Sequence, residues 1–140
     1  MKKRRSLLIR ILGTIVLLSA YPVFVLAYTW THVARADLPG GRHGPLDAYR
    51  HTLASAVVAF TLGPRAVQWA TPVLERGSKT SNAMDRHNNK IGAIIGARVD
   101  SFGEIESTVR AEVQRGTINA TDPHQVTWLP RERWRSGWMW

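Results

Sequence analysis

The N-terminal end of the chain combines a basic cluster with a long apolar run. Residues 2–5 are Lys-Lys-Arg-Arg, and residues 11–30 contain no charged side chain. A helix of about 20 apolar residues crosses the roughly 30 Å of hydrocarbon in a bilayer. Because basic residues before such a span stay in the cytoplasm, residues 1–30 predict a transmembrane or signal-anchor helix. We expect a single-pass protein of a bacterial inner membrane, with its C-terminal domain in the periplasm or outside.

The same segment has two other interpretations. Ala34-Arg35-Ala36 is a small-x-small sequence, so the chain could be cleaved as a signal peptide before Asp37. The apolar run is longer than the roughly 7–15 residues of a typical signal-peptide core, which favours a retained anchor. The remaining interpretation is the core helix of a soluble protein.

Helical patterns follow a short linker. Residues 31–43 are the expected linker, because Pro39-Gly40-Gly41 breaks regular structure. Residues 45–62 predict a helix that Gly44 caps and Gly63-Pro64 ends, with Pro45 at its first position. A second helix is expected over residues 64–75, kinked or broken by Pro72, and residues 77–81 form a polar loop.

Two further helices are expected before the tail. One starts after Asn82 and continues to about residue 99. The other starts at Ser101, which forms a capping-box pattern with Glu104, and ends near Gly116. Four positions of this last helix recur at helical spacing and predict a core-facing stripe: Phe102, Ile105, Val109 and Val113.

These patterns predict an all-α fold. The N-terminal transmembrane or signal-anchor helix precedes a bundle of about four helices over residues 44–116, and residues 117–140 form an irregular tail rich in Trp and Arg. The candidate interior residues of the bundle are Val57, Phe60, Val67, Trp69, Ile91 and Ile94.

Charge and composition narrow the function classes. The net charge is +9, but residues 1–30 hold five of the 19 basic residues, and the rest of the chain has 14 basic against 10 acidic residues. Such an excess is ordinary for a soluble domain, so no nucleic-acid partner is expected. The absence of cysteine excludes a disulfide, a thiolate metal site and a cysteine nucleophile.

Polar residues gather on one face of each of two predicted helices. Asp47 and His51 are four positions apart and share a face, with Arg50 beside them. The later helix has a stripe of polar and small residues: Asp85, Asn88, Asn89, Gly92 and Gly96. The glycines would let another helix approach closely while the Asp and Asn side chains point into the contact. Periodicity places His87 on the opposite face. We expect one site between the two helices.

Two kinds of chemistry suit such a site. Held by a carboxylate, His51 can act as a general base near neutral pH, with Asp85 as its partner. Alternatively, Asp47, His51 and Asp85 can bind a divalent metal, with Asn89 as a weaker or supporting ligand. Arg50 would orient a phosphate or carboxylate group of the substrate.

Each candidate also has a structural interpretation. Asp47 lies at the third helical position, where a carboxylate interacts favourably with the helix dipole. Asp85 follows Asn82 by three positions, which is a second capping-box pattern. Asn88 and Asn89 could satisfy backbone groups, and His51 could be a hydrogen-bonded core histidine. Glu75, at the end of the second predicted helix, could join the site or be solvated. His32, His43 and His124 are expected in solvated loops, although His43 is close enough in sequence to join the cluster.

Two segments carry a resemblance to a known family. Gly-Pro-Leu-Asp-Ala-Tyr-Arg-His at residues 44–51 and Met-Asp-Arg-His-Asn-Asn-Lys-Ile-Gly at residues 84–92 resemble an uncharacterised family of bacterial exported helical domains. Its members pair a DAxRH helix with an MDxxNNxxG helix, some in toxin-like architectures. The resemblance covers about residues 43–97 and implies a shared site without a reaction: Asp47, Arg50, His51, Asp85, Asn88, Asn89 and Gly92. Many members have a His-Glu pair where this chain has Leu74-Glu75, so one potential ligand or base is missing.

The tail interleaves aromatic and basic residues: Trp128, Trp134, Trp138 and Trp140 with Arg131, Arg133 and Arg135. This composition suits a membrane interface or a partner surface, where the rings lie at headgroup depth. It also suits stacking on a sugar or base. The third interpretation is a tail that packs back onto its own domain.

The sequence therefore favours a membrane-anchored extracytoplasmic helical domain with an Asp/Arg/His/Asn site. If the domain is an enzyme, we expect a hydrolase of a cell-envelope or phosphorylated substrate, with His51, Asp85 and Arg50 as catalytic residues. The alternative is a non-enzymatic interaction module, or an accessory subunit of a membrane complex, in which the same network is structural. Membrane lipid is the expected partner of the N-terminal helix.

Overall fold

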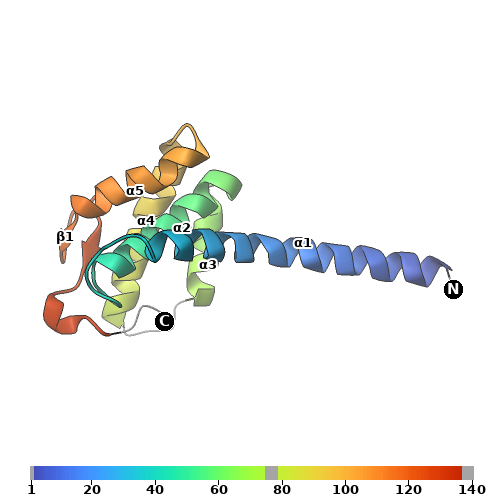
Figure 1. The fold of residues 1–140 in the computed structure, drawn as a ribbon, viewed down its shortest axis with the longest axis horizontal. Helices are drawn as coiled ribbons and strands as arrows, with labels where there is room; N and C mark the ends of the chain where they lie inside the picture. The colour runs from blue at the N-terminus through green and yellow to red at the C-terminus, as the bar shows by residue number, and fades with distance from the viewer. Residues whose placement is uncertain (1, 75–78, 137–140) are drawn as a thin grey trace.

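The computed structural model describes residues 2–74 and 79–136 and is mostly helical, as the sequence predicts. A long N-terminal helix projects from a compact group of shorter helices (Figure 1). The helices are α1 Lys2–Val33, α2 Pro45–Leu62, α3 Pro64–Leu74, α4 Lys79–Arg98 and α5 Ile105–Gln114, with a 3₁₀ turn η1 at Phe102–Glu104 and another, η2, at Arg131–Arg133.

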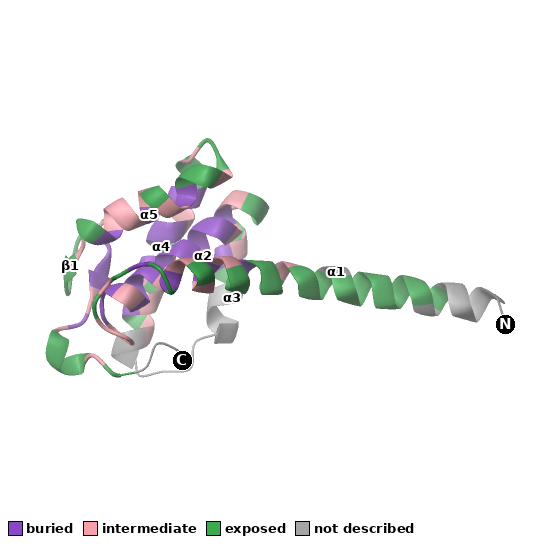
Figure 2. Ribbon diagram, in the orientation of Figure 1, coloured by how far each residue is buried: buried purple, intermediate pink, exposed green. Residues whose placement is uncertain are grey.

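Helix α2 is the centre of the domain and contacts α1, α3, α4 and α5. Its bounds are those that the sequence predicts, since Gly44 is the N-cap, Pro45 occupies the first turn and Gly63 ends the helix. The fully buried side chains of Tyr49, Leu53 and Val57 lie on it. Figure 2 shows buried residues along α2 and in parts of α4 and α5, the helices that pack on it.

Two glycines set the close contact between α2 and α4. A Cβ on Gly92 would collide with the carbonyl of Thr52, and a Cβ on Gly96 would collide with the carbonyl of Ala56. The predicted role of these glycines in a close helix approach is therefore confirmed. Because contacts advance along both helices together, α2 and α4 run in the same direction.

Helix α1 has two different halves. From Leu7 to Leu18 its described side chains are exposed, whereas Val25, Thr29 and Val33 are buried against the domain. The helix has the length and apolar composition of a membrane span over Ile9–Val33. It continues into the predicted linker, and Ala36 just beyond it is also buried. Residues 31–36 therefore belong to the packed structure rather than to a loose connection.

A polar network joins the end of this segment to α2 and α5. The Tyr49 hydroxyl donates to Glu106 at 2.7 Å, and the Arg110 Nε donates to the same carboxylate at 2.9 Å. Arg110 also donates to the carbonyl oxygen of Ala36 at 3.0 Å. Burial raises the pKa of Glu106, but the bonds from Tyr49 and Arg110 outweigh it, so the net pKa is lowered.

Several predicted helix ends differ from the structure. Helix α4 already begins at Lys79, so Asn82 and Asp85 lie inside the helix and not at its N-terminus. At Ser101 the hydroxyl bonds to the Glu104 carboxylate at 2.8 Å and does not cap the backbone. Helix α3 continues through Pro72 to Leu74. The predicted loop at residues 77–81 lies partly outside the described residues.

The predicted core is correct in part. Val57, Val67 and Ile91 are buried, whereas Phe60 and Ile94 are partly buried. Trp69 is 82% exposed, so its prediction was wrong. Two residues along a helix correspond to about 200° of rotation, and burial of Val67 therefore turns Trp69 to the opposite face. The stripe of α5 is confirmed by the burial of Ile105, Val109 and Val113.

The tail is more ordered than the sequence predicts. Strand β1, Thr117–Ile118, pairs in parallel with β2, Thr127–Trp128. Arg42 and Arg135 exchange backbone hydrogen bonds of 3.1 Å. The Trp134 indole packs against Gly40 and Gly44 and donates to the Leu129 carbonyl at 2.7 Å. The described part of the tail thus packs onto its own domain, while Trp138 and Trp140 lie outside the described residues.

The Glu106 network predicts an acid-dependent loss of stability. Because the folded-state pKa of Glu106 is lower than its ordinary value of 4.5, its contribution is present above pH 4.5 and is lost as pH falls through the folded value. We expect Glu106→Gln to remove part of this acid sensitivity. Urea unfolding of the detergent-solubilised chain from pH 7 to pH 3 measures it, with exposed Glu132→Gln as the control. An identical pH dependence in Glu106→Gln and the parent would contradict the prediction.

Candidate functional site

The first turn of α2 positions Asp47, whose side chain is almost fully buried. Its Oδ2 accepts the backbone N–H of His43 at 2.7 Å, and its Oδ1 accepts a hydrogen bond from Arg50. Asp47 thus satisfies a backbone donor just before the start of the helix, a contact that the sequence did not predict. Its Oδ1 also points toward the next turn, where His51 lies.

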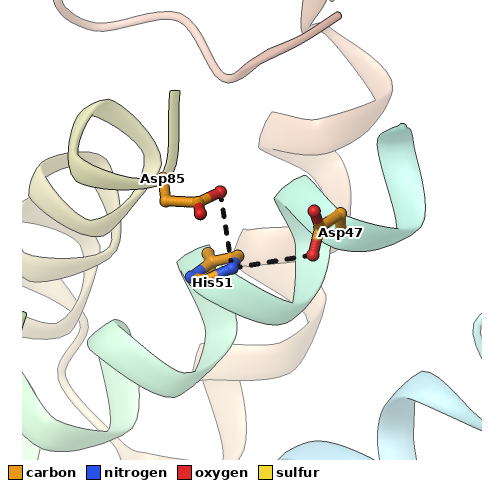
Figure 3. Close-up of side chains that lie close together, drawn as sticks. All are labelled: Asp47, His51 and Asp85. Carbon is orange, nitrogen blue, oxygen red and sulfur yellow. Dashed lines mark ion pairs between the residues drawn. The ribbon is translucent and has the colours of Figure 1, made fainter. Parts of the chain in front are cut away.

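His51 lies between two carboxylates. Its Nε2 is 3.6 Å from Asp47 Oδ1 and 3.4 Å from Asp85 Oδ1. Figure 3 shows the imidazole of α2 facing Asp47 on its own helix and Asp85 on α4. The side chains of His51 and Asp85 are 26% and 19% exposed, but Asp85 Oδ1, the oxygen that faces His51, is itself buried. The predicted meeting of the two helix faces is therefore observed.

The hydrogen bonds of His51 define its tautomer. Arg50 Nη2 lies 3.1 Å from His51 Nε2, and a guanidinium can only donate. Nε2 is then the acceptor, and the ring proton lies on Nδ1, which fits the side-chain hydrogen bond between His51 and Asn89. This assignment follows from the network. The Nε2 lone pair therefore accepts the Arg50 N–H, and a metal ion bound at Nε2 would take the place of that hydrogen bond.

Three potential metal-ligand atoms therefore converge. One atom each from Asp47, His51 and Asp85 lies within 4.8 Å of the other two. Two carboxylate oxygens and a neutral imidazole are ligands that Mn²⁺ and Zn²⁺ accept. The donor set fits a divalent cation, and Asn89 holds the imidazole from its other side, as outer-shell partners do in metal sites.

The electrostatics favour a neutral imidazole. Burial lowers the pKa of His51 to about 4, with a contribution from the positive charge of Arg50, although Asp47 acts in the opposite direction. A base with such a pKa accepts protons weakly at pH 7, where an efficient general base has a pKa near the operating pH. A neutral imidazole is the form that ligates a metal ion, so the lowered pKa is compatible with metal ligation.

Arg50 is engaged by groups within the protein. Its guanidinium bonds to Asp47, contacts His51 and lies 5.7 Å from the ring centroid of Trp30 on α1. It balances charge within the site and links α1 to it. Sequence reasoning missed this role of Trp30, because the contact joins segments that no motif relates.

The two asparagines divide between structure and site. The buried amide of Asn88 donates to the Thr127 carbonyl at 2.8 Å and accepts the Thr127 N–H at 3.0 Å, so it holds β2. Asn89 accepts a bond from Ser55 at 2.9 Å and contacts His51. The structure thus brings Asn89 into the site and commits Asn88 to the tail. Glu75 lies outside the described residues.

The other histidines are placed more variably than predicted. His43 is partly buried at the edge of the site, with its Nδ1 3.8 Å from Asp47 Oδ2, and burial lowers its pKa. His32 is partly buried against Tyr28. His87 contacts the Gln125 carbonyl at 2.8 Å. His124 is exposed, as expected.

A groove beside the site was also not predicted. It has a volume of about 880 Å³ between α3 and α4, and Asn89 is part of its lining. Arg86 and Lys90 line it as well. Arg86 and Lys90 directly follow the candidate site residues Asp85 and Asn89 in the sequence, and this was the one sequence feature that could have pointed to basic residues near the site.

No protein-family model, no curated protein and no solved structure matches this chain. The resemblance to the family of paired DAxRH and MDxxNNxxG helices therefore stays a prediction.

The different roles of the two asparagines can be tested by stability. Asn88→Ala leaves the buried N–H and C=O of Thr127 without this partner, so we expect a loss of about 2 kcal/mol. Asn89→Ala, at a partly buried position, is the matched control and should cost less. Chemical denaturation of both variants checks this. A larger loss for Asn89→Ala would reverse the assignment.

Proposed function

We propose that this chain is a single-pass membrane protein that keeps its N-terminal helix and hydrolyses phosphate esters with a divalent cation held by Asp47, His51 and Asp85. The observation that carries the proposal is the convergence of three ligand atoms within 4.8 Å. The site would face the periplasmic or outer side of the inner membrane.

The packing of α1 supports a retained anchor. Cleavage after Ala36 would remove Val25, Thr29 and Val33 from the core, as well as the Ala36 carbonyl that accepts from Arg110. It would also remove Trp30 from Arg50. A segment that is discarded contributes nothing to the mature core, so these contacts favour an anchor over a signal peptide.

The charge of the site supports a cation and an anionic substrate. With His51 neutral, the two carboxylates and the Arg50 guanidinium leave one negative charge, which repels a phosphate. A divalent cation would change the net charge to positive. Arg86 and Lys90, which line the adjacent groove, add to the attraction for an anion.

Hydrolysis of a phosphate ester needs an attacking water and stabilisation of the phosphoryl oxygens. The oxygen of water forms a bond to phosphorus and gives up a proton, the bond between phosphorus and the ester oxygen breaks, and the leaving oxygen takes up that proton to become the alcohol. A bound divalent cation would supply Lewis-acid stabilisation of the phosphoryl oxygens. Asp47, His51 and Asp85 would hold it, and Asn89 would orient the imidazole.

The retained anchor predicts the mass of the mature protein. Purified from membranes of an expressing bacterium, the chain should have its full mass of 15.7 kDa and should resist extraction by alkaline carbonate. Intact-mass spectrometry measures this directly. A mature chain that begins at Asp37 would contradict the retained anchor.

Cation binding predicts a coupled change in metal content and melting. The full chain in detergent should bind one Mn²⁺ or Zn²⁺, and saturation at 100 times the dissociation constant should stabilise it by about 2.7 kcal/mol. Asp85→Asn should lose both effects, because it removes one anionic ligand with little change in shape.

Exposed Asp100→Asn is the matched control and should keep both effects. The same samples are assayed for cation-dependent release of phosphate from para-nitrophenyl phosphate. Equal metal content in the parent and Asp85→Asn would contradict the site. Metal bound without hydrolysis of any phosphate ester would favour the non-enzymatic alternative.

A further inference from the structure

The depth of the site in a bilayer can be derived from α1. Large exposed apolar side chains recur from Leu7 to Leu26, a length of about 30 Å at 1.5 Å per residue, which equals the hydrocarbon thickness. Arg10, near the cytoplasmic end, can extend its charge to the headgroups. Trp30 lies about 6 Å beyond Leu26, within a headgroup layer of about 5–7 Å.

Trp30 connects this depth to the site. Its ring lies 5.7 Å from the Arg50 guanidinium, which bonds to Asp47 and contacts His51. With α1 in the membrane, the Asp47–His51–Asp85 site is therefore at the level of the lipid phosphates. A lipid could therefore reach the site while it is still in the bilayer.

The corner between α2 and α3 lies deeper. Tyr21, inside the apolar stretch of α1, shares a hydrogen bond with Thr61 near the end of α2. The adjacent Leu62 is 59% exposed, and Trp69 on α3 is 82% exposed. At this depth the exposed side chains of Leu62 and Trp69 would contact lipid. Pro64, at the same corner, lines the groove between α3 and α4.

The groove has the chemistry of an amphiphile site. Its volume of about 880 Å³ is in the range of ligand pockets. The apolar part of its lining includes Val67, Ala93 and Ile94. Its described lining also contains three cationic residues and no acidic one: Arg86, Lys90 and Arg98.

The site and the groove meet at Asn89. This residue lines the groove and hydrogen-bonds with Ser55 and His51. From Asn89 to Arg98, α4 borders the groove over about 13 Å. A ligand that places a phosphate near Asn89 can therefore extend an apolar chain along the groove.

We propose that the ligand of this site is an anionic phospholipid of the bilayer, with its acyl chain in the α3–α4 groove and its phosphate beside Arg86 and Lys90. The proposal names the substrate class of the proposed function and rests on its membrane anchor. Lipid seating itself does not need the divalent cation.

Photolabelling of the full chain tests this proposal. The protein is placed in phosphatidylcholine nanodiscs with a trace of phosphatidic acid that carries a diazirine at the end of one acyl chain. The comparison probe is phosphatidylcholine with the same labelled chain. Mapped by mass spectrometry, the phosphatidic acid probe should label Ala93, Ile94 and Ala97 more strongly than the comparison probe does.

Variants separate the charge from the groove. Lys90→Gln should lower the preference for phosphatidic acid about fivefold, as expected for one basic residue near a membrane. Ala93→Trp should block labelling of the groove but not of α1. Ala97→Trp, at an exposed position, repeats the test with less risk to folding. Ala83→Trp, exposed on the same helix outside the described lining, should leave labelling unchanged.

The outcomes are distinct from those of the cation experiment. Equal labelling by both probes, or labelling confined to α1, would overturn the lipid proposal even if the metal site is intact. Groove labelling that persists in Asp85→Asn and in a chelator would support lipid seating even if the cation proposal fails. Competition of the label by inorganic phosphate alone would identify a soluble anion as the ligand and overturn the proposal.

Discussion

The close contact of α2 with α4 is the constraint on which the rest of the structure depends. Gly92 and Gly96 carry no Cβ, so the backbone of α2 can lie directly against α4. At this separation Asp85 comes within 3.4 Å of His51, and Asn89 reaches Ser55. A side chain at either glycine would separate the helices and with them the three ligand atoms. Helix packing and site geometry are therefore the same feature.

Helix α1 combines a candidate membrane span with part of the domain core. Its N-terminal part presents apolar side chains outward, and its C-terminal part contributes Val25 and Val33 to the core. One rigid helix cannot move these parts independently, so the exposed apolar part of α1 has a fixed position relative to the domain. Through Trp30 and Arg50 the same helix contacts the polar site. The N-terminal helix, the core and the site are consequently coupled.

The polar residues near the site make different kinds of contact, although they are of similar type and lie close together in the sequence. Asn88 binds the backbone of β2, whereas Asn89, one residue later, faces the imidazole. Adjacent residues of a helix differ by about 100° in direction, so one amide faces the tail and the other faces α2. Asp47 makes both kinds of contact, since one oxygen accepts a backbone N–H and the other faces His51.

Local information in the sequence determined the limits of α2, the apolar span, the stripe of α5 and the meeting of Asp47, His51 and Asp85. Helical periodicity, proline and glycine positions, and the spacing of small residues act over a few residues, so they can be recognised without a fold. Tertiary structure alone decided that Trp69 is exposed, that Asn88 holds the tail and that α1 joins the core. It also decided that Arg50 contacts Trp30 and that a cationic, largely apolar groove lies beside the site. These features depend on which helix faces bury one another across long stretches of chain, and no local pattern specifies that choice.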